Sequence, residues 1–196
     1  MRKLLLFVLL LLPLSIQAQN IDIRLLRAFN DPKPLIYDGF FAHVSNSDMF
    51  VVVGTPVVMS FAAIIDNNDK LMKKAFVLAE ATVINLSITT ILKYSVQRER
   101  PFVTYRDIIN KSGKVCRDPS FPSGHTSTAF ATATMLSMEF PKWYVIVPSY
   151  GYACTVGYSR MRLGVHYPSD VLMGAIIGTG SAYLTHVINK KLHIKY

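Results

Sequence analysis

Three short clusters in the second half of the chain carry side chains that can do chemistry. The first reads Lys-x6-Arg-Pro and runs from Lys93 to Pro101. The second is the run Pro-Ser-Gly-His at residues 122–125, and the third reads Arg-x5-His-x3-Asp, from Arg160 to Asp170. Their defining positions hold three cations, two histidines and one carboxylate, beside the start of an apolar segment. This combination is typical of a site that transfers a phosphoryl group without a metal.

The cations and the helix start suit a phosphate group. Lys93, Arg100 and Arg160 can neutralise the negative charge that spreads over the phosphoryl oxygens during transfer. Ser123 can donate its hydroxyl, and the backbone N–H of Gly124 lies where a helix is expected to begin and where anions bind. Glycine at that position also lets a phosphate approach the backbone closely. We therefore expect these five residues to bind phosphate.

The two histidines and the carboxylate suit the covalent chemistry. One histidine can attack phosphorus while the other protonates the departing oxygen. Asp170 follows His166 by four residues, about one helical turn, so it can hold one ring nitrogen of that histidine. The clusters contain no set of carboxylates or cysteines suited to Mg²⁺ or Zn²⁺, so we expect neither a metal nor another cofactor.

Each cluster taken alone has a purely structural explanation. A lysine or arginine beside a membrane helix extends its charge to the interface. Pro-Ser-Gly-His can be a simple helix cap with Ser123 as the N-cap, and His166 with Asp170 can be another helix start. The joint occurrence of all three clusters favours the chemical interpretation.

The three clusters resemble, position for position, the signature of the type-2 phosphatidic acid phosphatase superfamily, which also includes bacterial acid phosphatases and vanadium haloperoxidases. No defining position departs from that pattern. The resemblance implies that His166 is a nucleophile that forms a phosphohistidine, that Asp170 orients it and that His125 is the general acid. The phosphate-binding residues that it implies are Lys93, Arg100, Ser123, Gly124 and Arg160.

The elements that must position these clusters are apolar. The chain has 196 residues, enough for one domain, and 51% of them are apolar while 17% are charged. Five apolar segments are found at Met49–Ile65, Ala75–Leu92, Gly124–Phe140, Trp143–Tyr158 and Asp170–Ile188. They are either membrane-spanning helices or the core helices of a secreted all-α domain.

Two features favour spanning helices. Pro141 and Lys142 leave room only for a tight hairpin, and Gly174, Gly178 and Ser181 put small residues on one face of the last segment, as close helix packing in lipid requires. We therefore predict an all-α, membrane-embedded bundle of five to six transmembrane helices with a core like that of the phosphatidic acid phosphatases and haloperoxidases.

The N-terminal part of the chain has the layout of a targeting segment. Residues 1–18 combine a short basic start with an apolar run, which indicates a signal peptide or an uncleaved anchor. We expect an amphipathic lead-in at residues 19–48 and the phosphatase-like domain at residues 49–190. Alternating spans then put all three clusters on the periplasmic or extracellular side of the cytoplasmic membrane.

The charge of the chain indicates an anionic partner. The formal charge is +9, but the basic residues are scattered between apolar runs, so we expect a phosphorylated lipid in the bilayer and no nucleic acid. Five basic residues near the clusters either steer an anionic headgroup or lie on a solvated loop: Arg98, Arg106, Lys111, Lys114 and Arg117.

The expected reaction is hydrolysis of a phosphomonoester or diphosphate on a membrane lipid. Candidate substrates are undecaprenyl diphosphate, phosphatidylglycerol phosphate, phosphatidate and the phosphates of lipid A. Two enzymatic alternatives are a secreted, soluble acid phosphatase and a vanadium-dependent haloperoxidase. A non-catalytic lipid-binding protein is a weaker third alternative, because binding alone does not need a His–Asp pair.

Overall fold

The computed structural model describes residues 21–31, 37–114 and 116–191, and over these residues it is helical and contains no strand. The expected signal peptide or anchor at residues 1–18 lies outside them. A helical stretch at residues 21–29 comes first. The helices that follow are α2 (Asp38–Ile65), α3 (Asp69–Val96), the single turn α4 (Pro101–Thr104), α5 (Gly124–Glu139), α6 (Trp143–Arg162) and α7 (Pro168–Lys191).

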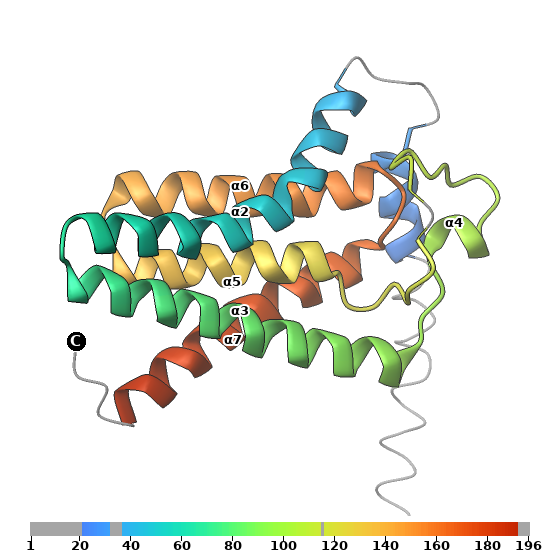
Figure 1. Cartoon of the computed structure of the whole chain (residues 1–196). Helices are drawn as coiled ribbons and strands as arrows, with labels where there is room; N and C mark the ends of the chain where they lie inside the picture. Colours follow the sequence, from blue (N-terminus) through green and yellow to red (C-terminus); the bar gives the residue numbers. More distant parts are fainter. Residues whose placement is uncertain (1–20, 32–36, 115, 192–196) are drawn as a thin grey trace, which may run out of the picture.

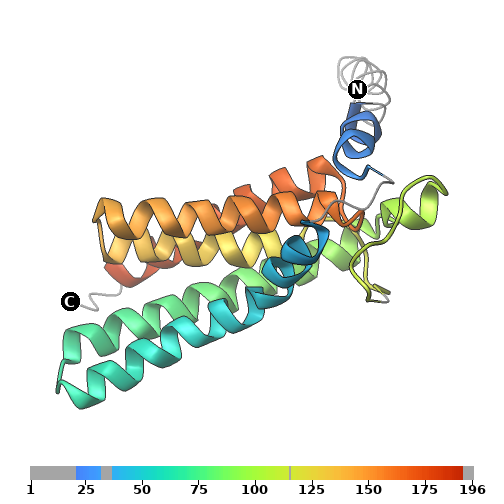
Figure 2. The ribbon, with the colours of Figure 1, turned by 90° about the horizontal axis from the view of Figure 1, so that it is seen from above.

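The five long helices form a bundle in which α5 is central. Helix α5 contacts α2, α3, α6 and α7, as its place between the other ribbons in Figure 1 shows. Seen from above, α2 and α3 lie beside each other on one side, and α5 and α6 lie together on the other (Figure 2). The 21–29 helix, α4 and the long loops gather at one end of the bundle, whereas the α2–α3 and α5–α6 turns lie at the opposite end (Figure 1).

Each of the five predicted apolar segments lies in one of these helices, so the all-α bundle is confirmed. Helices α2, α3 (with its extension to Thr104) and α7 are long and apolar enough to cross a membrane, by length and composition. Helix α5 has only 16 residues and is rich in threonine, but most of it is buried among its neighbours. Because other helices shield α5 from lipid, its sequence does not need to be apolar.

Helix α2 begins eleven residues before the predicted apolar segment, at Asp38 rather than Met49. Its first turns contain polar groups that find partners inside the protein. Asp38 accepts a hydrogen bond from Arg162 Nε at 2.6 Å, and Asp48 accepts one from Thr128 Oγ1 at 2.8 Å. Hydropathy does not recognise such a start, and the expected division between lead-in and domain at residue 48 falls inside this helix.

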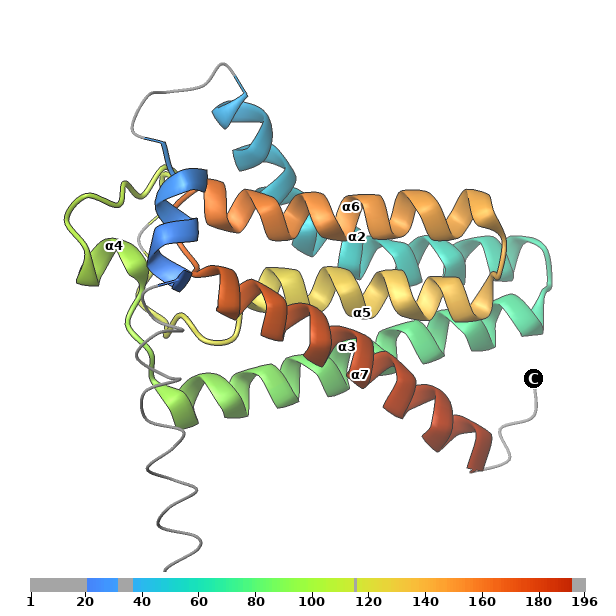
Figure 3. The ribbon, with the colours of Figure 1, turned by 180° about the vertical axis from the view of Figure 1, so that it is seen from behind.

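Close packing between α5 and α7 holds the motif residues at the starts of these two helices next to each other. A Cβ atom added at Gly174 would lie 2.7 Å from Ser123 O, and one added at Gly178 would lie 2.2 Å from Ser127 O. The predicted small-residue face of the last helix therefore packs directly on the α5 backbone. Helix α7 crosses the bundle at an angle to α5 (Figure 3), and Ser123 N donates a hydrogen bond to Asp170 O at 3.0 Å. The start of α5 and the start of α7 are thus held together.

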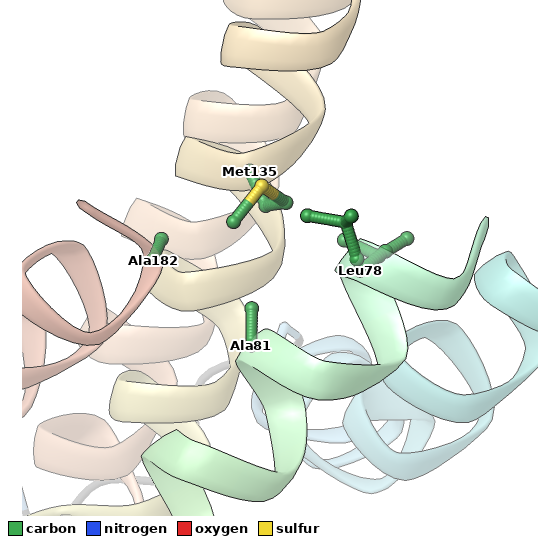
Figure 4. Close-up of a cluster of buried hydrophobic side chains, with 5 residues drawn as sticks. Leu78, Ala81, Met135 and Ala182 are labelled. Atoms are coloured by element: carbon green, nitrogen blue, oxygen red, sulfur yellow. The ribbon is translucent and has the colours of Figure 1, made fainter. Parts of the chain in front are cut away.

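The opposite half of the bundle is held by apolar contacts. Leu78 and Ala81 of α3 meet Met135 of α5 and Ala182 of α7, and all four side chains are at least 99% buried. Figure 4 shows these side chains converging between the three helices. The apolar core therefore supports the bundle away from the motif residues.

Candidate active site

A pocket at the loop end of the bundle brings the three sequence clusters together. Six of the eight predicted site residues line it, and Ser123 and Asp170 lie behind its wall. The lining residues are Lys93, Arg100, Ser112, Lys114, Cys116, Asp118, Gly124, His125, Arg160 and His166.

His166 lies in the short connection between α6 and α7 and is 1% exposed. Its Nδ1 atom is 3.6 Å from Asp170 Oδ2 and 3.4 Å from Ser120 Oγ, while Nε2 is 3.3 Å from Arg100 Nη1. Burial lowers the pKa of His166 to about 3, although Asp170 opposes this shift. The ring is therefore neutral near pH 7, with Nδ1 toward the carboxylate and Nε2 beside the cations that line the pocket.

Asp170 is completely buried and held by three donors. Arg98 Nη1 donates to Oδ1 at 2.7 Å, and Oδ2 accepts from Ser120 Oγ at 2.5 Å and from Tyr167 N at 2.9 Å. Arg98 also pairs with Asp22 of the 21–29 helix at 2.8 Å. Arg98 therefore supports the carboxylate behind His166 and does not point a charge toward an incoming headgroup.

Lys93 and Arg100 share one carboxylate. Lys93 Nζ is 2.9 Å from Asp118 Oδ2, and Arg100 Nη2 is 2.8 Å from Asp118 Oδ1. Backbone carbonyls hold the same two cations, because Lys93 donates to Pro119 O and Arg100 donates to Asp118 O and Val165 O. Burial by itself would raise the pKa of Asp118. The Lys93 hydrogen bond and the Arg100 charge outweigh burial and lower this pKa to about 2.

Arg160 approaches the pocket from α6 and is 6% exposed. Its Nη1 donates to Ser45 Oγ on α2, and Asp48 lies about one turn further along that helix. Its Nε atom has no hydrogen-bond partner among the described residues. A buried guanidinium with an unused donor is suited to a ligand with oxygen acceptors.

The start of α5 is organised differently from the expectation for Ser123. Ser123 is the N-cap residue, but its Oγ pairs with Thr126 Oγ1 at 2.8 Å and is fully buried. Direct contact between Ser123 and a phosphate therefore stays a prediction. Gly124 lines the pocket, and a Cβ atom there would meet Lys93 Cε at 3.8 Å.

The other basic residues separate into two groups. Lys111 pairs with Asp38 at 3.0 Å and has a structural role like that of Arg98. Lys114 lines the pocket, as a residue that steers a headgroup would, whereas Arg106 and Arg117 are exposed and do not line it.

Sequence reasoning missed Asp118 and Ser120, whose side chains contact predicted site residues, and it also missed Ser112 and Cys116 in the pocket lining. Asp118 and Ser120 are polar and lie within five residues of the Pro-Ser-Gly-His run, which is the one signal that could have found them. Asp22 and Ser45 gave no signal, because both lie more than 70 residues before the side chains that they contact.

A family model described as the PAP2 superfamily matches residues 74–194, which is more than half of the chain and includes every predicted site residue. The chain belongs to the PAP2 superfamily. PAP2 is the short name of the type-2 phosphatidic acid phosphatases, so the resemblance read from the three clusters is confirmed.

Characterised PAP2 relatives match part of this chain. An undecaprenyl-diphosphatase of Sulfolobus acidocaldarius is 32% identical over 116 residues, which cover 58% of this chain and 54% of that protein. A lipid A 1-phosphatase of Porphyromonas gingivalis is 39% identical over 89 residues, which cover 44% of this chain and 17% of that protein. The chain thus spans about half or less of these relatives' own length.

Two solved structures match most of the chain. The crystal structure of Aquifex aeolicus LpxE has a TM-score of 0.72 and 27% identity, covering 85% of this chain and 95% of that one. A transmembrane PAP2 type phosphatidylglycerolphosphate phosphatase from Bacillus subtilis has a TM-score of 0.73, covering 92% of this chain and 90% of that one; at 20% identity it shows the fold alone. With the three apolar spans, these matches identify a multi-pass membrane protein.

Proposed function

We propose that the protein hydrolyses a phosphomonoester or diphosphate on a membrane lipid through a phosphohistidine at His166. The observation that carries this proposal is the neutral, buried imidazole whose Nε2 lies beside pocket cations while its Nδ1 faces Asp170. Candidate substrates are undecaprenyl diphosphate, phosphatidylglycerol phosphate, phosphatidate and the phosphates of lipid A, and the names of the relatives fall in the same chemical class.

The first half of the reaction transfers the phosphoryl group to the enzyme. His166 Nε2 forms a bond to phosphorus as the bond from phosphorus to the leaving oxygen breaks, and His125 gives a proton to that oxygen. Burial and the charge of Arg160 lower the pKa of His125 to about 2, so His125 takes this proton from the bound phosphate group, which arrives with one acidic proton. Asp170 stabilises the charge that develops on the His166 ring. Lys93, Arg100 and Arg160 stabilise the phosphoryl oxygens.

The second half returns the enzyme to its starting state. His125, now neutral, takes a proton from a water molecule whose oxygen bonds to phosphorus, and the P–N bond to His166 breaks. His125 passes that proton to the departing inorganic phosphate and is neutral again, as at the start. For each water consumed the products are one inorganic phosphate and one lipid, which is the free alcohol when the substrate is a monoester and the lipid monophosphate when it is a diphosphate.

The pocket supplies its positive charge from side chains. Within residues 21–31, 37–114 and 116–191, no group of three or more His, Cys, Asp and Glu side chains is placed to hold a metal ion. Lys93, Arg100 and Arg160 instead line the pocket. We therefore expect activity to persist in excess chelator.

Lipid substrates are favoured by where the pocket lies. The site is at the end of helices long and apolar enough to cross a membrane, at the level where a bilayer presents headgroups. We propose that this end faces the periplasm or the extracellular medium, from the orientation implied by residues 1–18.

The experiment that tests the proposed function is a phosphate-release screen of purified protein in detergent with chelator present. We expect release from at least one of the four candidate lipid phosphates, far faster than from glucose phosphate. His166→Ala should abolish release, whereas the matched control His43→Ala, an exposed histidine on α2, should retain it. Equal rates on glucose phosphate would favour the soluble acid phosphatase, and bromide oxidation with added vanadate would favour the haloperoxidase.

A labelling experiment tests the proposed side of the membrane. In a Cys116→Ser, Cys154→Ser background, one cysteine is introduced at Arg106 on the pocket side or at Lys70 near the opposite end, both exposed positions. A membrane-impermeant thiol reagent should label the Arg106→Cys protein in intact spheroplasts and spare the Lys70→Cys protein. The reverse pattern would put the pocket in the cytoplasm.

A further inference from the structure

The carboxylate of Asp118 lies where a phosphate is needed. Each of its oxygens contacts one of the two cations from the Lys-x6-Arg-Pro cluster, at 2.9 Å from Lys93 Nζ and 2.8 Å from Arg100 Nη2. All three residues line the pocket that also contains His166. Two oxygens of a phosphate group would use the same donors in the same way.

We propose that Asp118 is an internal anion that competes with phosphate for Lys93 and Arg100 and so limits how tightly the pocket holds its phosphorylated substrate and its product. This inference rests on the proposed phosphate site but goes beyond it, because it assigns a role to a residue outside the three clusters.

The two cations do not need the Asp118 side chain to stay in place. Arg100 donates to the backbone oxygens of Asp118 and Val165, both at 2.9 Å, and Lys93 donates to the backbone oxygen of Pro119. None of these contacts involves the Asp118 carboxylate. A side chain whose only task was to position Lys93 and Arg100 would duplicate what the backbone already does.

The carboxylate can leave at small cost. The Asp118 side chain is 48% exposed, in contrast to Asp170, whose side chain is fully buried. A half-exposed carboxylate regains water as it leaves its partners. The Lys93 and Arg100 side chains are 12% and 5% exposed, but an arriving phosphate takes the place of the carboxylate, so neither buried cation is left unpaired. The pKa of Asp118, about 2, keeps its carboxylate negatively charged near neutral pH. The carboxylate is therefore displaced by an arriving anion and not by a change of pH.

Competition of this kind has a kinetic consequence. Inorganic phosphate carries charges like those of the substrate headgroup, so a pocket with three cations risks holding its product. An internal anion weakens the binding of substrate and product alike, which raises KM and the inhibition constant for phosphate. Product departure is correspondingly faster.

The test compares Asp118→Asn, which keeps the shape and removes the charge, with Asp118→Ala. Binding of inorganic phosphate to the purified, full-length protein is measured by calorimetry, which needs no turnover. We expect the dissociation constant to fall about tenfold in both variants, the size expected for one charge in a half-exposed site. The matched control is Asp107→Asn, an exposed carboxylate paired with Arg27 at 2.7 Å outside the pocket, and it should bind phosphate like the wild type.

Unchanged or weaker phosphate binding in both Asp118 variants would overturn the proposal, and weaker binding would show that the carboxylate positions the cations. Absence of binding in the wild type and both variants would overturn it as well. Failure of the proposed function is a separate result, namely no phosphate release from any lipid by the wild type, whatever calorimetry shows.

Discussion

The two walls of the pocket use similar side chains but are held in opposite ways. The histidine wall consists of His166 and Asp170, which are 1% and 0% exposed. The cation wall consists of Lys93 and Arg100 with Asp118, whose side chain is 48% exposed. The Lys93 and Arg100 side chains are also largely buried, at 12% and 5% exposure, so the two walls differ in their carboxylate: Asp170 is closed off from water and Asp118 opens toward it.

The difference in exposure between the carboxylates of the two walls suits two different tasks of the site. A nucleophile must keep one orientation, and the histidine wall provides it through buried partners that reach back to Asp22 in the 21–29 helix. A site for a charged group must accept and release it in every cycle. The cation wall suits that task, because the half-exposed Asp118 carboxylate pairs with the two cations when no phosphate is present and can give them up to a phosphate.

After the loss of the nucleophile itself, the largest expected effect comes from His125, which lies at the start of α5 and lines the pocket. His125→Ala removes the proton donor without changing either wall, so kcat on a lipid phosphate should fall by roughly 10²–10⁴. The loss should be smaller on a nitrophenyl phosphate, whose leaving group needs less help. Equal losses on both substrates would show that His125 has a different role.

A smaller effect is expected behind the histidine wall. Arg98→Gln leaves the buried Asp170 without its 2.7 Å partner, so kcat should fall on the order of ten- to a hundredfold while KM changes little. Arg98→Lys should restore part of the rate. The matched control Arg106→Gln, exposed and outside the pocket, should behave like the wild type. A raised KM with unchanged kcat would instead mean that Arg98 steers the headgroup.

The smallest expected effect concerns pH. Burial lowers the pKa of His166 to about 3, and the ring attacks phosphorus only when neutral, so the nucleophile remains active as the pH falls from 7 to 5. An ordinary histidine, with a pKa of about 6.5, would lose most of its neutral form over that interval. The measurement is the rate of enzyme phosphorylation under single-turnover conditions. A drop that follows a pKa near 6.5 would show that the histidine wall is open to water.

Sequence predicted the histidine wall better than the cation wall. The four-residue spacing of His166 and Asp170 is local and can be read from the sequence. The three motifs also predicted that both histidines and all three cations would meet in one pocket, and these residues all line it. Closeness to the Pro-Ser-Gly-His run singles out Asp118 as a candidate, but its contact with Lys93 and Arg100 could not be foreseen, because it depends on how the loop between α4 and α5 folds back over Lys93. The role of Arg98 was also out of reach, since its partners Asp22 and Asp170 lie 76 and 72 residues away.

The fold shows the same limit. Apolar runs located all five long helices, because burial in lipid or protein favours long apolar segments. They did not locate the start of α2, where Asp38 and Asp48 have partners that only the folded bundle provides. The structural role of a charged residue inside a helix can be assigned once its partners in the folded bundle are known.

The central claim is that His166 carries the phosphoryl group during turnover. The most direct measurement is to mix the protein with a lipid labelled with ³²P in its phosphate, quench in alkali, which preserves phosphohistidine, and locate the label by peptide mapping. The label should be found on the peptide that contains His166, and His166→Ala should remove it. Label on another residue, or sustained hydrolysis with no labelled enzyme at any time, would contradict the mechanism.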